Sequence, residues 1–310
     1  MSEQGAVSIQ PSALSLILAM LSIRSRVIHS VVLLLVLSAA SACFAVERVD
    51  CGTMRSRFVP RPVGYCAMLP PSYDAQPHRK FPVLYFLHGL GENQGFLVSS
   101  GGWQMIEDLW EQKQLGEFVI ITPQAWKSFY INSRDGKVKY EDFFIHDFMP
   151  EMEKKFRIMD TRSGRAIGGV SMGGYGALRF AFKYPELFVS VAVLMPALRE
   201  TLPRGFGDTG FVEFFGSAFG DPADEAYWKA NSPFVYARRN NLHGLKIYAV
   251  CGDQDDYGFN AGTRQLDKLL KRRRIEHLIE IYPGRHDWQF VARHLVSSLE
   301  FQARALGVGK

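Results

Sequence analysis

The chain has 310 residues, 47% of them hydrophobic and 22% charged, with a formal net charge of +5 at pH 7. This composition excludes an intrinsically disordered chain, and the length is enough for one large core, so a single main domain is expected. A charge this small for the length says little about binding partners, and no internal repeat or low-complexity linker divides the chain.

The N-terminus has the layout of a secretory signal peptide. Two arginines precede an aliphatic run at 27–37, and small residues follow up to the expected cleavage site. We therefore expect residues 1–45 to be a signal peptide and 46–310 to be an exported domain, periplasmic or secreted. The run is short for a membrane span, so no stable membrane partner is expected after cleavage. A membrane-anchored N-terminus, through the apolar stretch 14–23 or a lipid on Cys43, is the alternative.

Export changes how the cysteines are interpreted. Cys51 and Cys66 bracket two short strands expected on either side of Pro60 and Pro62. In an oxidising compartment a disulfide between the two cysteines is reasonable. Cys251 ends an apolar run, and we expect it to be a small core residue.

Strand and helix patterns alternate along the rest of the chain. Strands are expected at 81–91, where the run ends in a glycine turn, and at 117–122, 166–170, 188–194, 245–252 and 277–282. Helical patterns lie at 103–114 and 140–156, after Gly173, and from about 260 to the basic run 271–274. Most of the strand runs do not alternate with polar residues, as is typical of parallel strands covered on both faces. The alternation predicts an α/β fold with a mostly parallel central sheet and helices on both faces.

The turn that ends the first long strand is a candidate for anion stabilisation. Acyl transfer passes through a tetrahedral oxyanion, which backbone N–H groups can stabilise. In folds of this kind one N–H donor belongs to the residue after the nucleophile, for which Ser171 is the candidate described next, and another donor follows an early strand. We therefore predict an oxyanion hole from the backbones of Leu90 and Met172. His88 could act as a second base, but at a strand end beside glycine we expect it to hold the loop.

Ser171 lies at the bend between an expected strand and an expected helix. Gly169 and Gly173 flank it in the pattern G-x-S-x-G, which lets the backbone turn so sharply that the serine oxygen stands clear of the sheet. A nucleophile needs that exposure. The pattern alone fits an ordinary glycine-rich turn equally well, so the assignment depends on partners for the serine.

Candidate partners follow in the order serine, acid, histidine, which is the order for this arrangement. An activated serine needs a base within hydrogen-bond reach and a third group that orients the base. We assign Asp255, in the loop after the strand at 245–252, as the acid, with Asp253 and Asp256 as alternatives in another register. His286, in the loop after the last expected strand, is assigned as the base.

The segment 197–240 interrupts the strand pattern and is rich in aromatic residues. It is expected to be a helical, cap-like insertion that lines an acyl or aromatic pocket. The alternative is a helical excursion with a small core of its own. Trp103 and Trp288 are expected as further walls of the pocket.

No cofactor is implied, because serine, histidine and carboxylate carry every proton and electron transfer. The segment 253–258 starts like a calcium loop but has Arg264 where the bidentate glutamate belongs, and no zinc spacing surrounds His286, so no metal is predicted. The basic run 271–274 is expected to be a solvated helix end, and no nucleic-acid partner is predicted.

These motifs together resemble a bacterial esterase family of α/β hydrolases, which includes tributyrin and feruloyl esterases, S-formylglutathione hydrolases and the antigen 85 mycolyltransferases. The markers are LPPSY at 69–73, FPVLYFLHG at 81–89, GVSMGGYGA at 169–177, FGDP at 219–222, CG at 251–252 with Asp255, and GRHDW at 284–288. The resemblance runs from about residue 51 to 303. It implies an α/β-hydrolase fold, Ser171 as nucleophile, Asp255 and His286 as its relay, and Leu90 and Met172 as the oxyanion hole.

The expected function is that of a serine carboxylesterase that acts through an acyl-enzyme on a small-molecule or carbohydrate-linked ester. Two departures weigh against particular subfamilies. S-formylglutathione hydrolases have histidine where this chain has Val170, and the mycolyltransferases have Met-Ala-Gly where it has Met-Gly-Gly after the serine. The alternatives are an acyltransferase that moves the acyl group to a sugar or alcohol, and a non-catalytic binding protein on the same fold.

Overall fold

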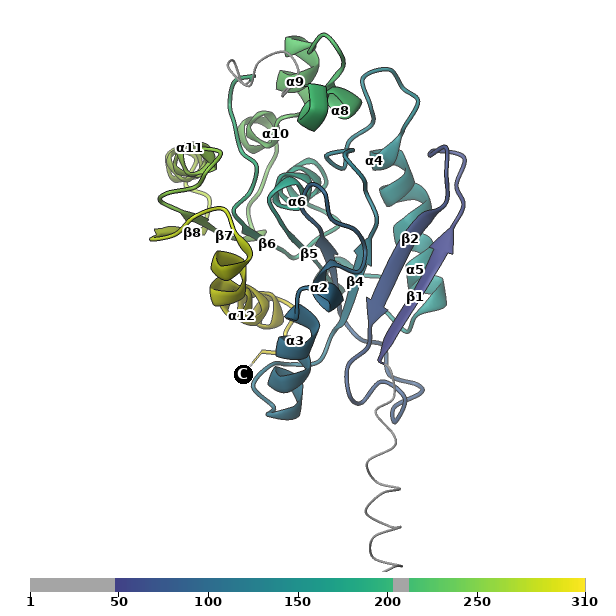
Figure 1. Ribbon diagram of the computed structural model, residues 1–310. Helices are drawn as coiled ribbons and strands as arrows, with labels where there is room; N and C mark the ends of the chain where they lie inside the picture. The colour runs from purple at the N-terminus through teal and green to yellow at the C-terminus, as the bar shows by residue number, and fades with distance from the viewer. Residues whose placement is uncertain (1–47, 203–211, 310) are drawn as a thin grey trace, which may run out of the picture. The chain divides into compact units, whose positions relative to one another are not determined.

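An eight-stranded sheet forms the centre of the computed structural model, which describes residues 48–202 and 212–309 (Figure 1). The expected signal peptide lies outside these residues. The strands are β1 (Val49–Met54), β2 (Val63–Met68), β3 (Val83–Leu87), β4 (Val119–Pro123), β5 (Arg165–Val170), β6 (Ser190–Leu194), β7 (Lys246–Gly252) and β8 (Leu278–Tyr282). Their spatial order is β1-β2-β4-β3-β5-β6-β7-β8.

Six neighbouring strands, from β4 and β3 through β8, run parallel, whereas β1 and β2 form an antiparallel edge. The parallel strands β3, β4 and β6 are buried along their whole length, which explains why their sequences lack a polar face. Cys51 lies opposite Cys66 in the β1–β2 register, and the two are joined by a disulfide with a Cα–Cα distance of 4.0 Å.

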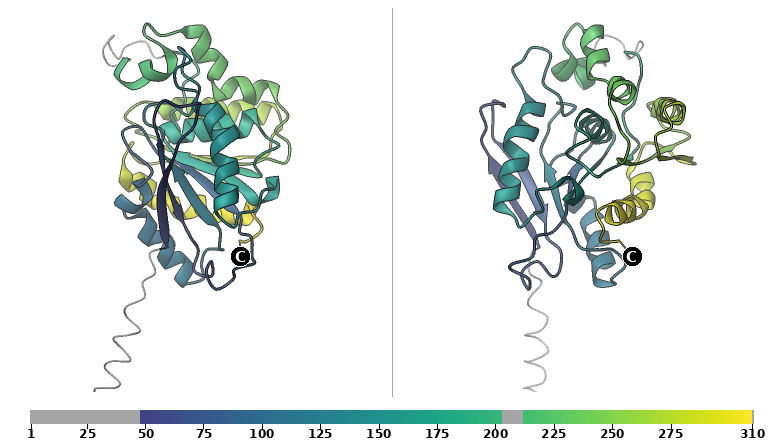
Figure 2. Two further views of the ribbon diagram at one scale, coloured as in Figure 1. Left: turned by 90° about the vertical axis from the view of Figure 1, so that its right-hand side faces the viewer. Right: turned by 180° about the vertical axis from the view of Figure 1, so that it is seen from behind.

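Helices cover both faces of the sheet (Figure 2). They are α2 (Phe96–Ser99), α3 (Gly102–Glu111), α4 (Tyr140–Phe143), α5 (Met149–Lys155), α6 (Met172–Lys183), α8 (Ser217–Phe219), α9 (Glu225–Asn231), α10 (Pro233–Arg239), α11 (Phe259–Arg272) and α12 (Trp288–Ala305), with the short turns η1 (Phe144–Phe148), η2 (Arg162–Gly164) and η3 (Val212–Gly216). Helix α6 packs on β3, β5 and β6 beside α10, and α12 packs on β5, β6 and β7 beside α3, on the opposite face. The fold is therefore the doubly covered α/β sheet that the sequence predicts.

Two expected helices differ in extent from their patterns. The helix expected at 103–114 ends at Glu111, because Lys113 takes up a left-handed conformation with a φ of 54°. The helix expected at 140–156 is divided into α4, a π-helical turn and α5. Pro150 lies just after that turn, and because proline has no N–H to continue the α-helical ladder, the wider turn accommodates the break.

The segment between β6 and β7 contains η3 and helices α8 to α10, above α6 in Figure 1. It combines both roles that its aromatic sequence suggests. Phe219 and Trp228 pack together with ring centroids 4.6 Å apart, in a small cluster of the insertion itself. Phe215 joins this cluster, with its ring centroid 5.5 Å from that of Trp228, and together with Phe214 it also lines a cavity at the carboxyl ends of the strands. Phe206 and Phe211 lie outside the described residues.

Within residues 48–202 and 212–309, no helix is both long and apolar enough to cross a bilayer.

Candidate active site

Ser171 occupies a strained bend between β5 and α6. Its φ of 54° and ψ of −113° lie in a region that L-residues rarely adopt. The flanking glycines are required by close packing, because a Cβ on Gly169 would lie 2.5 Å from the carbonyl oxygen of Leu87 and one on Gly173 only 1.9 Å from it. The G-x-S-x-G pattern is thus a sharp elbow that presents the serine at the end of the sheet.

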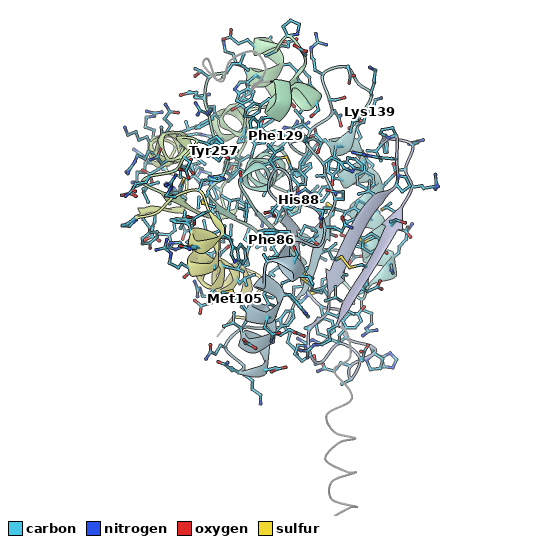
Figure 3. All side chains as sticks on the ribbon, viewed as in Figure 1. Phe86, His88, Met105, Phe129, Lys139 and Tyr257 are labelled. Carbon is cyan, nitrogen blue, oxygen red and sulfur yellow. A yellow bond between two sulfur atoms is a disulfide. The ribbon has the colours of Figure 1, made fainter. Side chains whose placement is uncertain are left out.

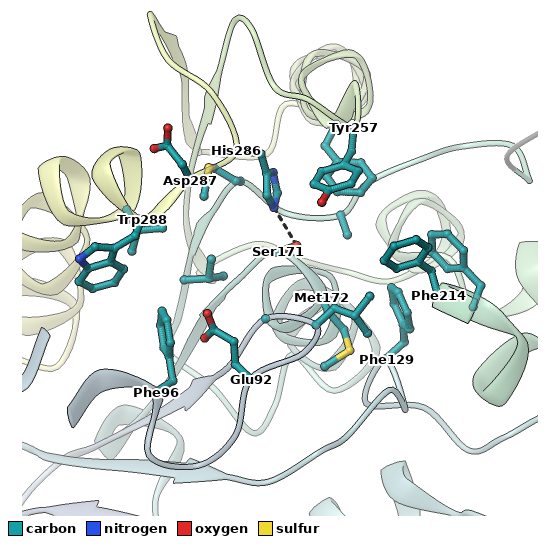
Figure 4. A pocket seen from close by; sticks show the side chains of 18 residues that line it. Glu92, Phe96, Phe129, Ser171, Met172, Phe214, Tyr257, His286, Asp287 and Trp288 are labelled. Atoms are coloured by element: carbon teal, nitrogen blue, oxygen red, sulfur yellow. Dashed lines mark hydrogen bonds between the residues drawn. The ribbon is translucent and has the colours of Figure 1, made fainter. Parts of the chain in front are cut away.

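The loops after β7 and β8 bring an acid and a histidine to this serine. The Nε2 atom of His286 lies 3.0 Å from the Oγ of Ser171, and its Nδ1 lies 2.6 Å from Oδ2 of Asp255. The His286 side chain is 10% exposed and that of Asp255 is completely buried. All three residues assigned from the sequence therefore meet in one hydrogen-bonded chain, shown in part in Figure 4.

Asp255 is held as an ionised acceptor. Its Oδ1 accepts hydrogen bonds from the backbone N–H groups of Tyr257 and Phe259, both at 3.0 Å. Burial opposes ionisation of this carboxyl, but its bond with His286 and these two amides together hold its pKa below the usual value. A carboxylate fixed in this way orients the imidazole and favours the tautomer that carries hydrogen on Nδ1.

The two alternative acids in the same loop have other roles. Asp256 accepts from the Nε of Arg285 at 3.0 Å and from the backbone N–H of His286 at 3.0 Å. Asp253 accepts from the backbone N–H of Gly284 at 3.1 Å. Both carboxylates thus fix the loop that carries the histidine, while Asp255 alone of the three contacts the histidine ring.

Cys251 is buried at the end of β7, as expected for a small core residue, but it also contacts the site. Its Sγ lies 3.6 Å from Oδ2 of Asp255, the oxygen that faces His286. Burial raises the pKa of the Cys251 thiol, so it stays protonated and can donate to the carboxylate.

Leu90 and Met172, the two expected oxyanion donors, both line the cavity in front of Ser171. Met172 is the first residue of α6, so its N–H has no partner within the helix and can point to a ligand. His88 supports the turn below them. Its Nε2 accepts from the N–H of Ala125 at 2.9 Å, its Nδ1 lies 2.7 Å from the carbonyl oxygen of Gly89, and burial lowers its pKa to about 4. This is the structural role expected for His88.

The cavity in front of Ser171, called here the serine cavity, has a volume of about 210 Å³. It is lined by Gly89, Leu90, Glu92, Phe96, Phe129, Val170, Ser171, Met172, Met195, Ala197, Phe214, Phe215, Tyr257, Phe259, His286, Asp287, Trp288 and Val291. Figure 4 shows Phe129, Phe214 and Tyr257 on one side of Ser171 and Glu92, Phe96 and Trp288 on the other. The labelled residues on one side of an ester bound at Ser171 would thus all be aromatic, whereas those on the other side would combine two aromatic rings with the carboxyl group of Glu92.

Several lining residues were not found from the sequence. Glu92 and Phe96 belong to the segment that follows the glycine turn after β3, and Phe129 follows β4, so no strand-end motif marks them. Trp288 lines the cavity as expected. Trp103 does not, because it packs against Trp110 with ring centroids 5.7 Å apart.

Over the part of the chain that the structure describes, no three side chains of histidine, cysteine, aspartate or glutamate gather closely enough to hold a metal ion. The basic run 271–274 ends α11, where Lys271 pairs with Asp267 at 2.9 Å.

Comparisons with known proteins agree with this fold. The model of the family described as "Putative esterase" matches residues 56–301. The chain is 30% identical over 248 residues to the esterase Rv1288 from Mycobacterium tuberculosis, which covers 72% of this chain and 52% of that protein. It is 26% identical to an acetyl esterase from Caldicellulosiruptor saccharolyticus, over 72% of this chain and 83% of that one.

Solved structures show the same fold. A ferulic acid esterase superposes with a TM-score of 0.71 at 24% identity, covering 84% of this chain and 98% of the other. An S-formylglutathione hydrolase from Agrobacterium tumefaciens superposes with a TM-score of 0.67 at 18% identity, over 84% and 95% of the two chains.

A mostly parallel sheet with a strained serine elbow at its carboxyl edge defines an α/β-hydrolase-fold protein. Within that class the chain belongs to the "Putative esterase" family, whose model covers most of its length. It spans about half the length of the Mycobacterium tuberculosis relative that it matches.

Proposed function

We propose that the protein is a serine carboxylesterase that works through an acyl-enzyme. The observation that carries this proposal is the hydrogen-bonded chain from Ser171 Oγ through His286 to Asp255, which opens onto a largely apolar cavity. The three groups are within the distances that proton transfer from a serine requires. Membership of an esterase family supports the same reaction.

In the proposed reaction Ser171 Oγ attacks the ester carbonyl carbon while His286 Nε2 takes the serine proton. The N–H groups of Leu90 and Met172 are proposed to stabilise the oxyanion. When the intermediate collapses, His286 gives the proton to the departing alcohol. Water, deprotonated by the same histidine, then cleaves the acyl-enzyme and restores the serine, with Asp255 fixing the imidazole throughout.

The size of the serine cavity favours short acyl groups. Its volume of about 210 Å³ is below the roughly 300–1,000 Å³ of pockets that hold drug-sized ligands. We therefore expect hydrolysis of p-nitrophenyl esters to be fastest for acetate to butyrate and to fall towards palmitate. Transfer of the acyl group to a sugar or alcohol in preference to water is the competing activity, and analysis of the products for free acid distinguishes the two.

The first test is the variant Ser171→Ala. Removing the nucleophile should lower kcat by several orders of magnitude, up to about a millionfold, because the remaining groups cannot form an acyl-enzyme. A fluorophosphonate probe should label the wild-type protein at Ser171 and should not label the variant. The melting temperature of both proteins serves as the folding control. Wild-type turnover in a folded Ser171→Ala variant would refute the proposal, and absence of labelling in the wild-type protein would favour a non-catalytic binding protein.

We also propose that the domain acts outside the cytoplasm. The signal-peptide pattern in residues 1–45 supports export, and a disulfide between Cys51 and Cys66 is consistent with an oxidising compartment. Small-molecule or carbohydrate-linked esters are the substrates that an exported esterase would meet there.

A further inference from the structure

Glu92 borders the serine cavity with a carboxyl oxygen that lacks a partner. Its Oε2 is buried, and within residues 48–202 and 212–309 no group hydrogen-bonds to it. Figure 4 shows the carboxyl group pointing into the cavity, on the side of Ser171 that faces Phe96. The catalytic scheme above makes no use of this group.

A buried carboxyl oxygen without a donor is costly, and most buried polar groups avoid that state. Burial also raises the pKa of Glu92 to about 7. A ligand hydroxyl placed at Oε2 would supply the missing donor. The site therefore favours a substrate with an O–H group close to the scissile ester.

A second cavity, of about 560 Å³, meets the serine cavity at Glu92, which lines both. The second cavity is lined by Pro60, Arg61, Gly91, Glu92, Gln124, Trp126, Lys127, Ser128, Ile131, Ser133, Val138 and Ser217. Several of its lining residues are exposed, so it opens to solvent. Its size is within the range of ligand pockets. Most of its lining surface is apolar, as in the serine cavity, but its walls also carry hydroxyl, amide and charged side chains.

One wall of the second cavity is held in a strained shape. Trp126 has a φ of 51°, and the Arg61 guanidinium lies 4.2 Å from the centre of its ring. Non-glycine residues in this region cost free energy, and strained residues cluster at active sites and ligand clamps. A flat aromatic ring between polar groups is a surface on which the C–H face of a sugar ring can pack.

We propose that the second cavity binds the alcohol part of the substrate, an alcohol with several hydroxyl groups, and that Glu92 accepts a hydrogen bond from one of them at the junction. This assignment rests on the proposed esterase function. The alcohol is assigned to the second cavity because it must leave to water before the acyl-enzyme is hydrolysed, and this cavity opens to solvent and has serine, glutamine, arginine and lysine side chains in its walls. The aromatic side of the serine cavity then holds the acyl group.

The test compares three acetate esters that share one acyl group: ethyl acetate, glycerol monoacetate and 6-O-acetylglucose. We expect the wild-type kcat/KM to be higher for the glycerol and glucose esters than for ethyl acetate. In Glu92→Leu the ratio of kcat/KM for either hydroxylated ester to that for ethyl acetate should fall about tenfold, because the acceptor is lost. In Glu92→Gln, which keeps a carbonyl oxygen at the same place, the fall should be smaller.

A second variant separates a sugar ring from an open-chain polyol. Trp126→Ala should lower the ratio for 6-O-acetylglucose and leave that for glycerol monoacetate as it is, if the ring packs on the indole. If Trp126→Ala changes neither ratio while Glu92→Leu lowers both, Glu92 recognises the hydroxyl groups of the alcohol and no sugar ring packs on the indole. As a matched control, Glu186→Leu changes an exposed glutamate outside both cavities and should leave every ratio unchanged.

The outcomes distinguish this inference from the esterase proposal. Fluorophosphonate labelling of each variant shows that its serine site is assembled. If the wild-type protein is not labelled and hydrolyses none of the esters, the esterase function fails and this inference fails with it. If ethyl acetate is hydrolysed but the ratios in Glu92→Leu equal those of the wild type, the esterase function stands and the role of Glu92 is refuted.

Discussion

Asp255 illustrates how single residues acquire separate roles within one short loop. It lies between Asp253 and Asp256, yet only Asp255 contacts the imidazole of His286. The carboxylates of Asp253 and Asp256 are occupied by the backbone and side chain of the histidine loop. Of these three chemically similar carboxylates, Asp255 therefore orients the imidazole of His286, and the other two hold the loop that carries it.

At the same scale, Glu92 predicts a pH dependence of stability. Its pKa is about 7 in the folded protein and near 4.5 in the unfolded chain, so between these values the folded state binds more protons than the unfolded state. Stability conferred by this residue is therefore greatest at low pH and falls as pH rises from about 4.5 to 7. The charged groups that line the two adjoining cavities are Arg61, Lys127, His286 and Asp287.

The variant Glu92→Gln tests this prediction, because glutamine cannot ionise. Relative to the wild type, its free energy of unfolding should be nearly the same at pH 4.5 and higher at pH 8, by on the order of 1–2 kcal/mol after solvent screening of the half-buried group. Urea denaturation at the two pH values measures the difference. A stability difference that does not change with pH would show that Glu92 keeps an ordinary pKa.

At the scale of elements, a buried charge network ties the helical insertion to α6, the helix that follows Ser171. Arg179 on α6 donates to Glu141 on α4 at 2.7 Å and to Asn231 on α9 at 2.8 Å. Glu141 also accepts from Lys183 at 2.5 Å and from Tyr184 at 2.6 Å. Burial alone would raise the pKa of Glu141, but Arg179 and these donors lower it to about 2, so the pair stays charged.

Removing one partner of this network should destabilise the protein strongly. In Glu141→Gln the guanidinium of Arg179, whose side chain is 2% exposed, would remain buried without a counter-charge. We expect a loss of about 3–5 kcal/mol in the free energy of unfolding, measured by urea denaturation. The matched control Glu276→Gln breaks an exposed pair with Lys246 and should cost less than about 1 kcal/mol. Equal effects in the two variants would contradict the network's importance.

The elements that could be predicted from the sequence are those fixed by local chemistry. The apolar runs mark the parallel strands, and G-x-S-x-G marks the elbow because only glycine fits against Leu87. The order of the loops after β7 and β8 identifies Asp255 and His286 as partners for the serine. Glu92 and Phe129 could not be found in this way, because only the sheet order brings the segments after β3 and β4 beside Ser171. The division of the 140–156 pattern depends on one proline within an otherwise helical sequence.

For the whole molecule, the stability of the protein should depend on export, because the disulfide between β1 and β2 forms in an oxidising compartment. Cys51 and Cys66 are 15 residues apart, and a disulfide that closes a loop of this length stabilises a protein by about 3 kcal/mol. We expect the exported protein to begin at Val46, by intact mass, and to contain the oxidised pair. Residues 46–310 produced in a reducing cytoplasm should have free thiols at both positions and a lower melting temperature.

The double variant Cys51→Ala with Cys66→Ala is the control for this prediction. Its melting temperature should be the same with and without a reducing agent and should match that of the reduced wild type. A wild-type melting temperature that does not change on reduction would show that the edge is held by its strand pairing alone. An exported protein whose N-terminal residue is not Val46 would contradict the proposed cleavage site.

The strained elbow at Ser171 has a consequence for the evolution of this chain. A backbone with φ of 54° and ψ of −113° suits glycine better than serine, so the cost is carried by whichever side chain occupies the position. A descendant released from the need for a nucleophile would gain stability by exchanging Ser171 for glycine. Selection for the proposed reaction thus favours serine at this position, whereas selection for a stable fold favours glycine. The presence of serine indicates that selection for the reaction has prevailed.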